Sequence, residues 1–191
     1  MSVQEAFATA EVHKAQGLLN GPEWSYQLRK DGVYWRDDSG KTPKWRWLCA
    51  PIEVAADTRD AGSENWGRLL VFEDRDGKRH EWAAPAADLS RTQSGEVIAH
   101  LARLGFVPPT SPRDKNKLIK YLFTALPAAR LKAVGRVGWE GSVFVLPDAS
   151  YGGDSDERIC LQLEGAQAEH SYQIAGDLAE WQRHISSVTN A

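Results

Sequence analysis

After Pro22, turn-forming residues interrupt the chain every few positions and leave short β segments between them. This pattern constrains the fold more than any other feature, because short strands joined by tight turns pair as antiparallel hairpins. The clearest turn is Asp76-Gly77, a pair suited to positive φ angles. An earlier turn at Lys30-Asp31-Gly32 predicts a second hairpin. The strands expected in this region are Trp24–Leu28, Val33–Arg36, Trp45–Thr58, Trp66–Glu73 and Lys78–Ala84.

Helical periodicity replaces the strand pattern in the middle of the chain. A first helix is capped by Ser90 or Ser94 and stops at Gly105. A second opens at Ser111-Pro112, with serine at the cap and proline at the first helical position. The side chains expected to point inward are Val97, Ile98, Leu101 and Leu104, then Leu118, Ile119, Leu122, Phe123 and Leu126. Capping boxes predict further helices at Ser2-x-x-Glu5 and Asp177-x-x-Glu180. Further strands are expected at Leu131–Trp139, Ser142–Leu146, Arg158–Leu163 and Ser171–Ile174.

Together these elements predict an α+β fold, with mainly antiparallel β hairpins and sheet packed with three to four helices. Hairpins, rather than strand–helix–strand crossovers, are expected to connect the strands. We expect an N-terminal helical segment at residues 1–21 and a β-rich α+β accessory domain at residues 22–191. No apolar run approaches the roughly 20 residues that cross a bilayer, so we expect a cytoplasmic protein without a membrane partner. Cys49 and Cys160 are expected to be reduced and buried in strands.

No motif for catalysis, a cofactor or a metal ion is complete. Ser39-Gly40-Lys41-Thr42 resembles the end of a phosphate-binding loop, but Trp35 stands where the first glycine belongs and Pro43 follows in place of a helix. The acidic run Glu73–Gly77 lacks the later glutamate of a calcium loop, and a hairpin turn explains it better. The five histidines are scattered, without metal-ligand spacing. We therefore expect a chain that is not an enzyme, with no catalytic residues, no cofactor and no metal site.

Charge is distributed unevenly, although the net charge is only −3. Residues 101–136 carry eight basic residues and one acidic residue, whereas residues 137–191 carry two and nine. The helix that Pro112 opens places three cations opposite its apolar face, and the following strand region adds three more. The predicted nucleic-acid contacts are Arg113, Lys117, Lys120, Arg130, Lys132 and Arg136. Such a surface contacts phosphates without reading bases, and a plain solvated helix face is the competing interpretation.

Four tryptophans of the expected strands are candidates for a base-binding surface. They are Trp45, Trp47, Trp66 and Trp82. Exposed aromatic rings on a sheet can stack on single-stranded bases. Rings of this size bury well between sheet and helix, however, so we expect these four in the core.

Several short blocks of residues occur in an order typical of one known family. The first are Gly32-Val33-Tyr34, the run Trp47–Val54, and the run Trp66–Gly77 followed by His80-x-Trp82. The later ones are Leu101-x-x-Leu104-Gly105, Tyr121-Leu122, Val137–Gly141, Phe144–Asp148 and Gly176-x-Leu178-x-Glu180-Trp181. By the order and spacing of these blocks, the chain from about Trp24 to Trp181 resembles the domain-of-unknown-function family 927.

The resemblance implies the leading module of prophage and integrative-element proteins, in which a P-loop ATPase with helicase character follows. The family has no assigned catalytic residues, so none is carried over. This chain stops at Ala191, and we expect the motor domain to be absent from it. The expected function is that of a non-catalytic accessory module of a mobile-element or phage DNA helicase in DNA replication. It would engage DNA or position the motor, in cis or in trans. The alternative is a protein-interaction module that forms a homo-oligomer, docks a loader or acts as a stand-alone phage inhibitor.

Overall fold

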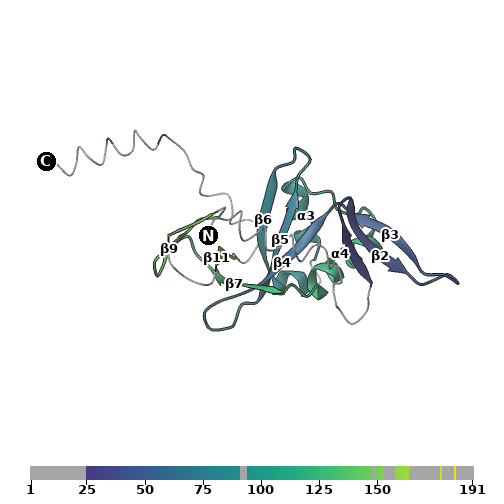
Figure 1. The fold of residues 1–191 in the computed structure, drawn as a ribbon, viewed down its shortest axis with the longest axis horizontal. Helices are drawn as coiled ribbons and strands as arrows, with labels where there is room; N and C mark the ends of the chain where they lie inside the picture. The colour runs from purple at the N-terminus through teal and green to yellow at the C-terminus, as the bar shows by residue number, and fades with distance from the viewer. Residues whose placement is uncertain are drawn as a thin grey trace.

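The computed structural model describes residues 25–90, 94–147, 149–152 and 158–163, together with Asp177 and Arg183. Within these ranges the chain forms three β-sheets and three helices, so the fold is predominantly sheet. The strands are β1 (Tyr26–Arg29), β2 (Gly32–Asp37), β3 (Lys44–Cys49), β4 (Ile52–Arg59), β5 (Gly67–Glu73), β6 (Arg79–Pro85), β7 (Ala129–Val134), β8 (Gly138–Glu140), β9 (Val143–Val145), β10 (Ser150–Gly152) and β11 (Ile159–Leu161). The helices are α2 (Ala86–Ser90), α3 (Ser94–Arg103) and α4 (Pro112–Thr124). Figure 1 shows β2, β3 and α4 at one end of the molecule and β7, β9 and β11 at the other, with β4, β5 and β6 between them.

Three predicted elements lie outside the described residues, apart from Asp177 and Arg183. They are the helix that begins at the Ser2 capping box, the strand Ser171–Ile174 and the helix that begins at the Asp177 capping box.

β1, β2 and β3 form a small antiparallel sheet with β2 in the middle. The predicted hairpin around Lys30-Asp31-Gly32 is confirmed. The prediction of one strand from Trp45 to Thr58 is wrong, because the chain breaks at Ala50-Pro51 and changes sheet there. Pro51 has no N–H to donate to a ladder, and Ala50 N donates to Val107 O in the loop before α4. β3 therefore completes the small sheet, whereas β4 belongs to a larger one.

The larger sheet has the strand order β11-β7-β4-β5-β6. The predicted hairpin of β5 and β6 is confirmed, and the two strands pair in antiparallel register. Its turn spans four residues, since Gly77 N donates to Asp74 O at 3.2 Å. Gly77 takes a φ of 79°, whereas Asp76 does not adopt the positive φ that a two-residue Asp-Gly turn would need. The hairpin was therefore predicted correctly and its turn type was not.

β7 and β11 join the larger sheet in parallel orientation. β7 pairs with β4 from Ala129 opposite Ala56, and β11 pairs with β7. Six of the eight strand pairs in the described ranges are antiparallel, which agrees with a mainly antiparallel fold. The expectation that hairpins replace crossovers is wrong between β4 and β7, because that connection passes through β5, β6 and the three helices. Turn residues reveal strands that are adjacent in sequence, but they do not reveal which distant strand completes a sheet.

β8, β9 and β10 form the third sheet, in the order β10-β9-β8. The predicted strand Leu131–Trp139 is divided in the structure, because β7 ends at Val134 and β8 begins at Gly138, which has a φ of 124°. The predicted hairpin across Glu140-Gly141 is confirmed. A small apolar cluster of Val143, Val145 and Ile159 ties this sheet to β11.

The main core lies between the sheets and the three helices. Its buried residues include Val54, Leu70, Phe72 and Trp82 from strands, and Leu89, Val97, Leu101, Leu118 and Leu122 from helices. The predicted end of α3 at Gly105 and the predicted start of α4 at Ser111 are both confirmed. Gly105, just after α3, has a φ of 84°, and the Ser111 hydroxyl at the start of α4 accepts a hydrogen bond from Asp114 N at 3.1 Å.

The inward face of α4 differs in part from the prediction. Leu118 and Leu122 are buried as expected, whereas Phe123 and Leu126 are exposed. Tyr121 takes the missing place: it is buried, and its hydroxyl donates to Ile52 O of β4 at 2.9 Å. A phenol can be buried when its hydroxyl finds an acceptor, and this hydrogen bond fixes α4 to the larger sheet.

Candidate nucleic-acid interface

α4 carries three of the six predicted nucleic-acid contacts. Arg113 and Lys120 are exposed and make no ion pair with any residue that the structure describes. Lys117 differs from them, because its Nζ lies 2.7 Å from Asp114 Oδ1 and 3.4 Å from the centre of the Trp35 ring. Its side chain is only 18% exposed, and its hydrogen bond is the main cause that lowers the pKa of Asp114. Lys117 therefore holds α4 against β2 and is the least accessible of the three.

The other three predicted contacts lie on β7 and in the loop after it. Lys132 is engaged, since its Nζ is 2.9 Å from Glu140 Oε1 on β8 and this contact lowers the pKa of Glu140. Arg130 and Arg136 are exposed and, within the described ranges, have no ion-pair partner. The structure thus leaves four of the six predicted cations accessible.

Arg68 of β5 joins the end of α4 to β4. Its Nη2 donates to Phe123 O at 2.8 Å, and its guanidinium pairs with Asp57 of β4. Asp57 is in turn the register partner of Arg130. Lys120 lies one helical turn before the end of α4. Lys120 and Arg130 therefore lie on either side of the contacts that Arg68 makes with Phe123 and Asp57.

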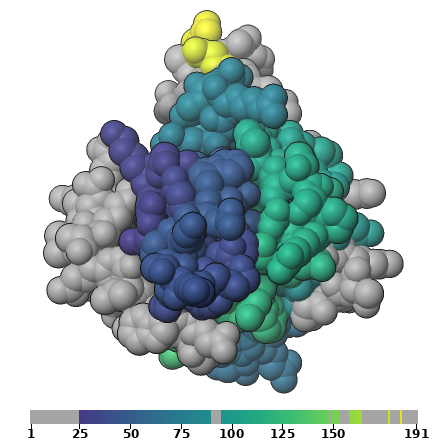
Figure 2. Space-filling model, turned by 90° about the vertical axis from the view of Figure 1, so that its right-hand side faces the viewer, coloured from purple at the N-terminus to yellow at the C-terminus, as the bar shows by residue number. Residues whose placement is uncertain are grey.

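A second surface is one face of the small sheet, which we call the aromatic face and define as Tyr34, Trp45, Trp47, Arg29 and Arg36. Tyr34 stands opposite Trp47 and Arg36 opposite Trp45, and residues two apart in a strand share a face. The Arg29 guanidinium lies 4.1 Å from the centre of the Tyr34 ring and 5.9 Å from that of Trp45. In Figure 2 the β2–β3 hairpin, coloured dark blue, lies at the front of the molecule beside the green α4.

The exposure of these rings corrects the prediction that the strand tryptophans lie in the core. Trp82 is buried with 4% of its surface exposed, as predicted. Trp45 is 40% exposed, Trp47 is 50% exposed, and Trp66 is likewise exposed. For Trp45 and Trp47 the reason is that α4 packs against the Trp35 side of the small sheet and not against the Tyr34 side. Trp66 lies outside the small sheet, just before β5.

Trp47 is held in place across the start of β2. Its Nε1 donates to Asp31 O at 3.2 Å, and its ring lies so close to Gly32 that a side chain there would meet the indole. Gly32 has a φ of 154°, in a region that favours glycine. The indole is therefore positioned by the backbone on one side, while half of its surface remains exposed.

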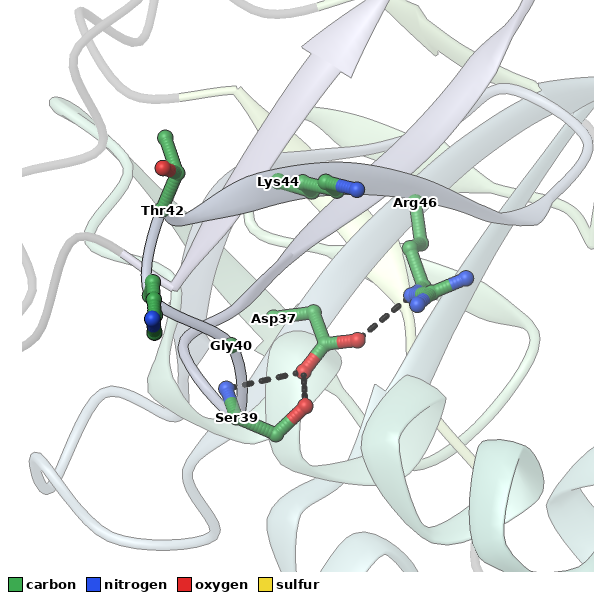
Figure 3. A pocket seen from close by; sticks show the side chains of 7 residues that line it. Asp37, Ser39, Gly40, Thr42, Lys44 and Arg46 are labelled. Atoms are coloured by element: carbon green, nitrogen blue, oxygen red, sulfur yellow. Dashed lines mark hydrogen bonds and ion pairs between the residues drawn. The ribbon is translucent and has the colours of Figure 1, made fainter.

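The tip of the β2–β3 hairpin forms a shallow hollow of about 240 Å³. Its lining residues are Asp37, Ser39, Gly40, Lys41, Thr42, Lys44 and Arg46. Figure 3 shows that the Asp37 carboxylate accepts hydrogen bonds from the Ser39 hydroxyl and amide and pairs with Arg46. The Ser39 hydroxyl, followed by Arg46, lowers the pKa of Asp37 to about 2. Lys41 and Lys44 have no ion pair with a described residue, so the hollow presents positive charge to solvent.

The two incomplete motifs are ordinary turns in the structure. Ser39–Thr42 connects two antiparallel strands and is followed by β3, so it forms no phosphate loop at a helix N-terminus. In the run Glu73–Gly77, the Asp74 carboxylate accepts from Asp76 N and Lys78 N at 2.9 Å each and contacts His80 Nε2 at 2.8 Å. These hydrogen bonds, that of His80 first, lower the pKa of Asp74.

Neither a metal-binding cluster nor a membrane-spanning helix occurs in the described ranges. No group of three or more His, Cys, Asp or Glu side chains there is arranged to hold a metal ion. None of the helices there combines the length and the apolar character that a bilayer-crossing segment needs.

A stacking surface on the strand tryptophans was weighed from the sequence and rejected, although a signal for an exposed face was present. Tyr34 shares its side of β2 with Arg36, and an arginine two positions along a strand indicates a solvent-facing side. The alternation of Lys44, Trp45, Arg46 and Trp47 did not decide which side is covered, because both sides carry amphipathic side chains. Only the strand register connects Tyr34 to Trp47.

The chain was compared with known proteins. No curated protein matches it. Among solved structures, a protein described as "SCCmec type IV Cch - active helicase" matches with 14% sequence identity and a TM-score of 0.48. That match covers 85% of this chain and 29% of the helicase, so the chain spans less than a third of that protein's length. A likeness of this degree carries no argument about function. The family described as domain of unknown function (DUF927) matches residues 26–191, and the chain belongs to this family.

Proposed function

We propose that this chain is a non-catalytic accessory module of a helicase-type protein and that it engages DNA through phosphate contacts on α4 and β7. The observation that carries the proposal is the set of four exposed cations that make no ion pair among the described residues. They are Arg113, Lys120, Arg130 and Arg136. Exposed cations without an ion-pair partner are available to neutralise phosphates. Membership of DUF927 supports the helicase context, since the resemblance to this family implies that a P-loop motor follows the domain.

The start of α4 favours an anionic ligand for a second reason. The N-terminal end of a helix carries partial positive charge from its aligned peptide dipoles. Arg113 and Lys115 lie in the first turn and a half of α4, where cations are unfavourable for the helix. Asp114 is the one acidic residue in the first turn. A phosphate group near this end would meet the dipole and the side-chain charges together. Contacts of this kind do not read sequence and serve duplex and single-stranded DNA alike.

Charge-reversed variants test this proposal. Fluorescence anisotropy would follow the binding of a labelled duplex at low salt, with Arg113→Glu/Lys120→Glu as the variant. The control is Arg75→Glu/Lys78→Glu, which changes the net charge equally in the exposed β5–β6 turn. We expect the α4 variant to weaken binding and to reduce the salt slope by about 0.9 for each phosphate that it no longer neutralises. Equal weakening in both variants would mean that only the total charge matters, and the proposed surface would be wrong.

A different observation favours the alternative function, a protein-interaction module. On the β10-β9-β8 sheet, Trp139 and Tyr151 both stand opposite Phe144, and the Trp139 and Phe144 rings meet edge to face at 5.2 Å. Trp139 is 66% exposed, and exposed aromatic groups of this kind are typical of protein interfaces. The occupant that we consider is a second copy of this chain. Sedimentation velocity would show a concentration-dependent dimer that Trp139→Ser dissociates, and a monomer at all concentrations would exclude it.

A further inference from the structure

We propose that the aromatic face of the β1–β2–β3 sheet binds single-stranded DNA by stacking unpaired bases on Trp45, Trp47 and Tyr34. This inference deepens the proposed function, on which it rests, by naming the form of DNA that is bound and a set of residues that hold it. The surface differs from the cations of α4 and β7, so the two sets of contacts can be tested separately.

Ring exposure and spacing carry the inference. Trp45 and Trp47 lie two residues apart on β3, which places both indoles on the same side of the strand, with their Cα atoms about 7 Å apart. Tyr34 stands opposite Trp47 across the β2–β3 pair, so the three rings form one group on an open sheet face. Bases of a single strand offer free π surfaces to such rings, whereas those of a duplex are already stacked on one another. The surface therefore fits unpaired bases and not duplex DNA.

Charge complementarity favours a nucleic acid over an apolar partner. Residues 25–49 contain six basic and three acidic residues. All three acids are engaged within the hairpin: Asp31 accepts from the Tyr34 hydroxyl, Asp37 pairs with Arg46, and Asp38 pairs with Arg36. Arg29 lies over the Tyr34 ring on the aromatic face itself. Arg29 thus stands beside the rings, where a stacked strand would carry its phosphates, and Lys41 and Lys44 lie at the tip of the same hairpin.

The hollow at the hairpin tip extends this positive surface. Lys41 and Lys44 line it and, among the described residues, have no carboxylate partner. Lys44 and Trp45 are adjacent in β3, so their side chains lie on opposite faces of the small sheet. β3 is the edge strand of that sheet, so the two faces meet along it. A DNA strand stacked on Trp45 can therefore reach these lysines by turning over that edge.

Two of the three rings, those of Trp47 and Tyr34, are positioned before any ligand binds. Hydrogen bonds from the Trp47 indole and from the Tyr34 hydroxyl both end on Asp31, at 3.2 Å and 2.6 Å. Gly32 lets the Trp47 indole lie directly against the backbone. Side chains that are fixed in this way lose little conformational freedom on binding, which favours affinity.

The test compares single-stranded and duplex DNA of the same length. A labelled oligothymidylate of about 12 nucleotides would be titrated at low salt by fluorescence anisotropy, since single-strand sites of this kind cover about 4–16 nucleotides. The variants are Trp45→Leu, Trp45→Phe and Trp47→Leu. Trp66→Leu is the matched control, because it removes an indole of similar exposure, 43%, that lies outside the small sheet, just before β5.

We expect Trp45→Leu and Trp47→Leu each to weaken oligothymidylate binding by about fivefold or more and to change duplex binding by less than twofold. Trp45→Phe keeps a ring and should retain most of the affinity, which separates stacking from a general loss of folding. Trp66→Leu should bind as the unsubstituted chain does.

Three results would overturn the inference. Unchanged oligothymidylate binding by Trp45→Leu and Trp47→Leu would exclude stacking, while the phosphate contacts of α4 and β7 could still stand. Equal weakening for the oligothymidylate and the duplex would exclude the preference for single strands. If the unsubstituted chain bound neither DNA, both this inference and the proposed function would be wrong.

Discussion

Gly32 is the position at which one methyl group should have the largest effect on the small sheet. A Cβ on this residue would stand 2.5 Å from Cys49 O and closer still to the Trp47 indole nitrogen. The carbonyl belongs to the backbone of β3, so it can move only if β2 and β3 separate. Gly32 also has a φ of 154°, which an alanine adopts only with strain.

The magnitude for Gly32→Ala follows from these two effects. A non-glycine residue in such a region costs about 1–3 kcal/mol. Displacement of the Trp47 indole breaks its hydrogen bond to Asp31 O, which is worth about 1 kcal/mol. We therefore expect a loss of about 2–4 kcal/mol in the free energy of unfolding. For a chain of this length that loss lowers Tm by roughly 4–16 °C.

Thermal and urea unfolding would measure the effect, with Gly95→Ala as the control. Gly95 lies in α3, its φ is not positive, and no atom would lie within 4 Å of an added Cβ. The control should be neutral or more stable by about 0.4–1 kcal/mol, since alanine favours helix over glycine. A Gly32→Ala variant with Tm within about 2 °C of the unsubstituted chain would refute the reasoning.

Three further predictions concern groups inside the fold. Tyr121→Phe removes the hydrogen bond to Ile52 O and should reduce the free energy of urea unfolding by about 1 kcal/mol; an unchanged midpoint would contradict it. Burial raises the pKa of both the Cys49 and Cys160 thiols to about 12, so iodoacetamide at pH 8 should alkylate neither in the native chain and both in urea. The pKa of Asp37 is lowered to about 2, below its unfolded value, so its contribution to stability is present above about pH 4 and is lost as the pH falls toward 2. Carboxyl NMR titration should give a midpoint near 2, and a midpoint near 4 would show that its hydrogen bonds do not form.

Local chemistry made several parts of the fold predictable. Ser111 and Gly105 mark helix boundaries because the backbone itself needs a capping oxygen or a positive φ there. The β5–β6 hairpin was equally visible, since a turn brings its own neighbours together. Pro51 carried a usable signal as well, because a proline inside an expected strand marks a break or an edge.

Tertiary contacts decided what the sequence could not predict. A strand has two sides, and its period of two does not say which side a helix will cover. The contact of Lys117 with Trp35 places α4 on one side of the small sheet, and Trp45 and Trp47 are exposed as a result. The pairing of β7 with β4 depends on residues about 70 positions apart, for which local turn signals carry no information.

At the candidate site, too, some contacts follow from the local sequence and others depend on tertiary contacts. The positive segment was evident from charge alone, and the pairing of Lys117 with Asp114 follows from their spacing on a helix. The pairing of Lys132 with Glu140 depends on how β7 and β8 approach each other, so sequence reasoning could not remove Lys132 from the predicted contacts. Charge patterns identify a basic segment, but the fold decides which cations remain available.

The parallel pairing of β7 with β4 has a consequence for the synthesis of the chain. About 70 residues separate Arg59 at the end of β4 from Ala129 at the start of β7. At about 5–20 residues per second, the outer edge of β4 waits roughly 4–14 s for its partner. An unpaired edge is a template on which another nascent chain can add a strand. Any fragment that ends before Ala129 keeps that edge open permanently, so we expect the shortest well-behaved fragment of this domain to include β7.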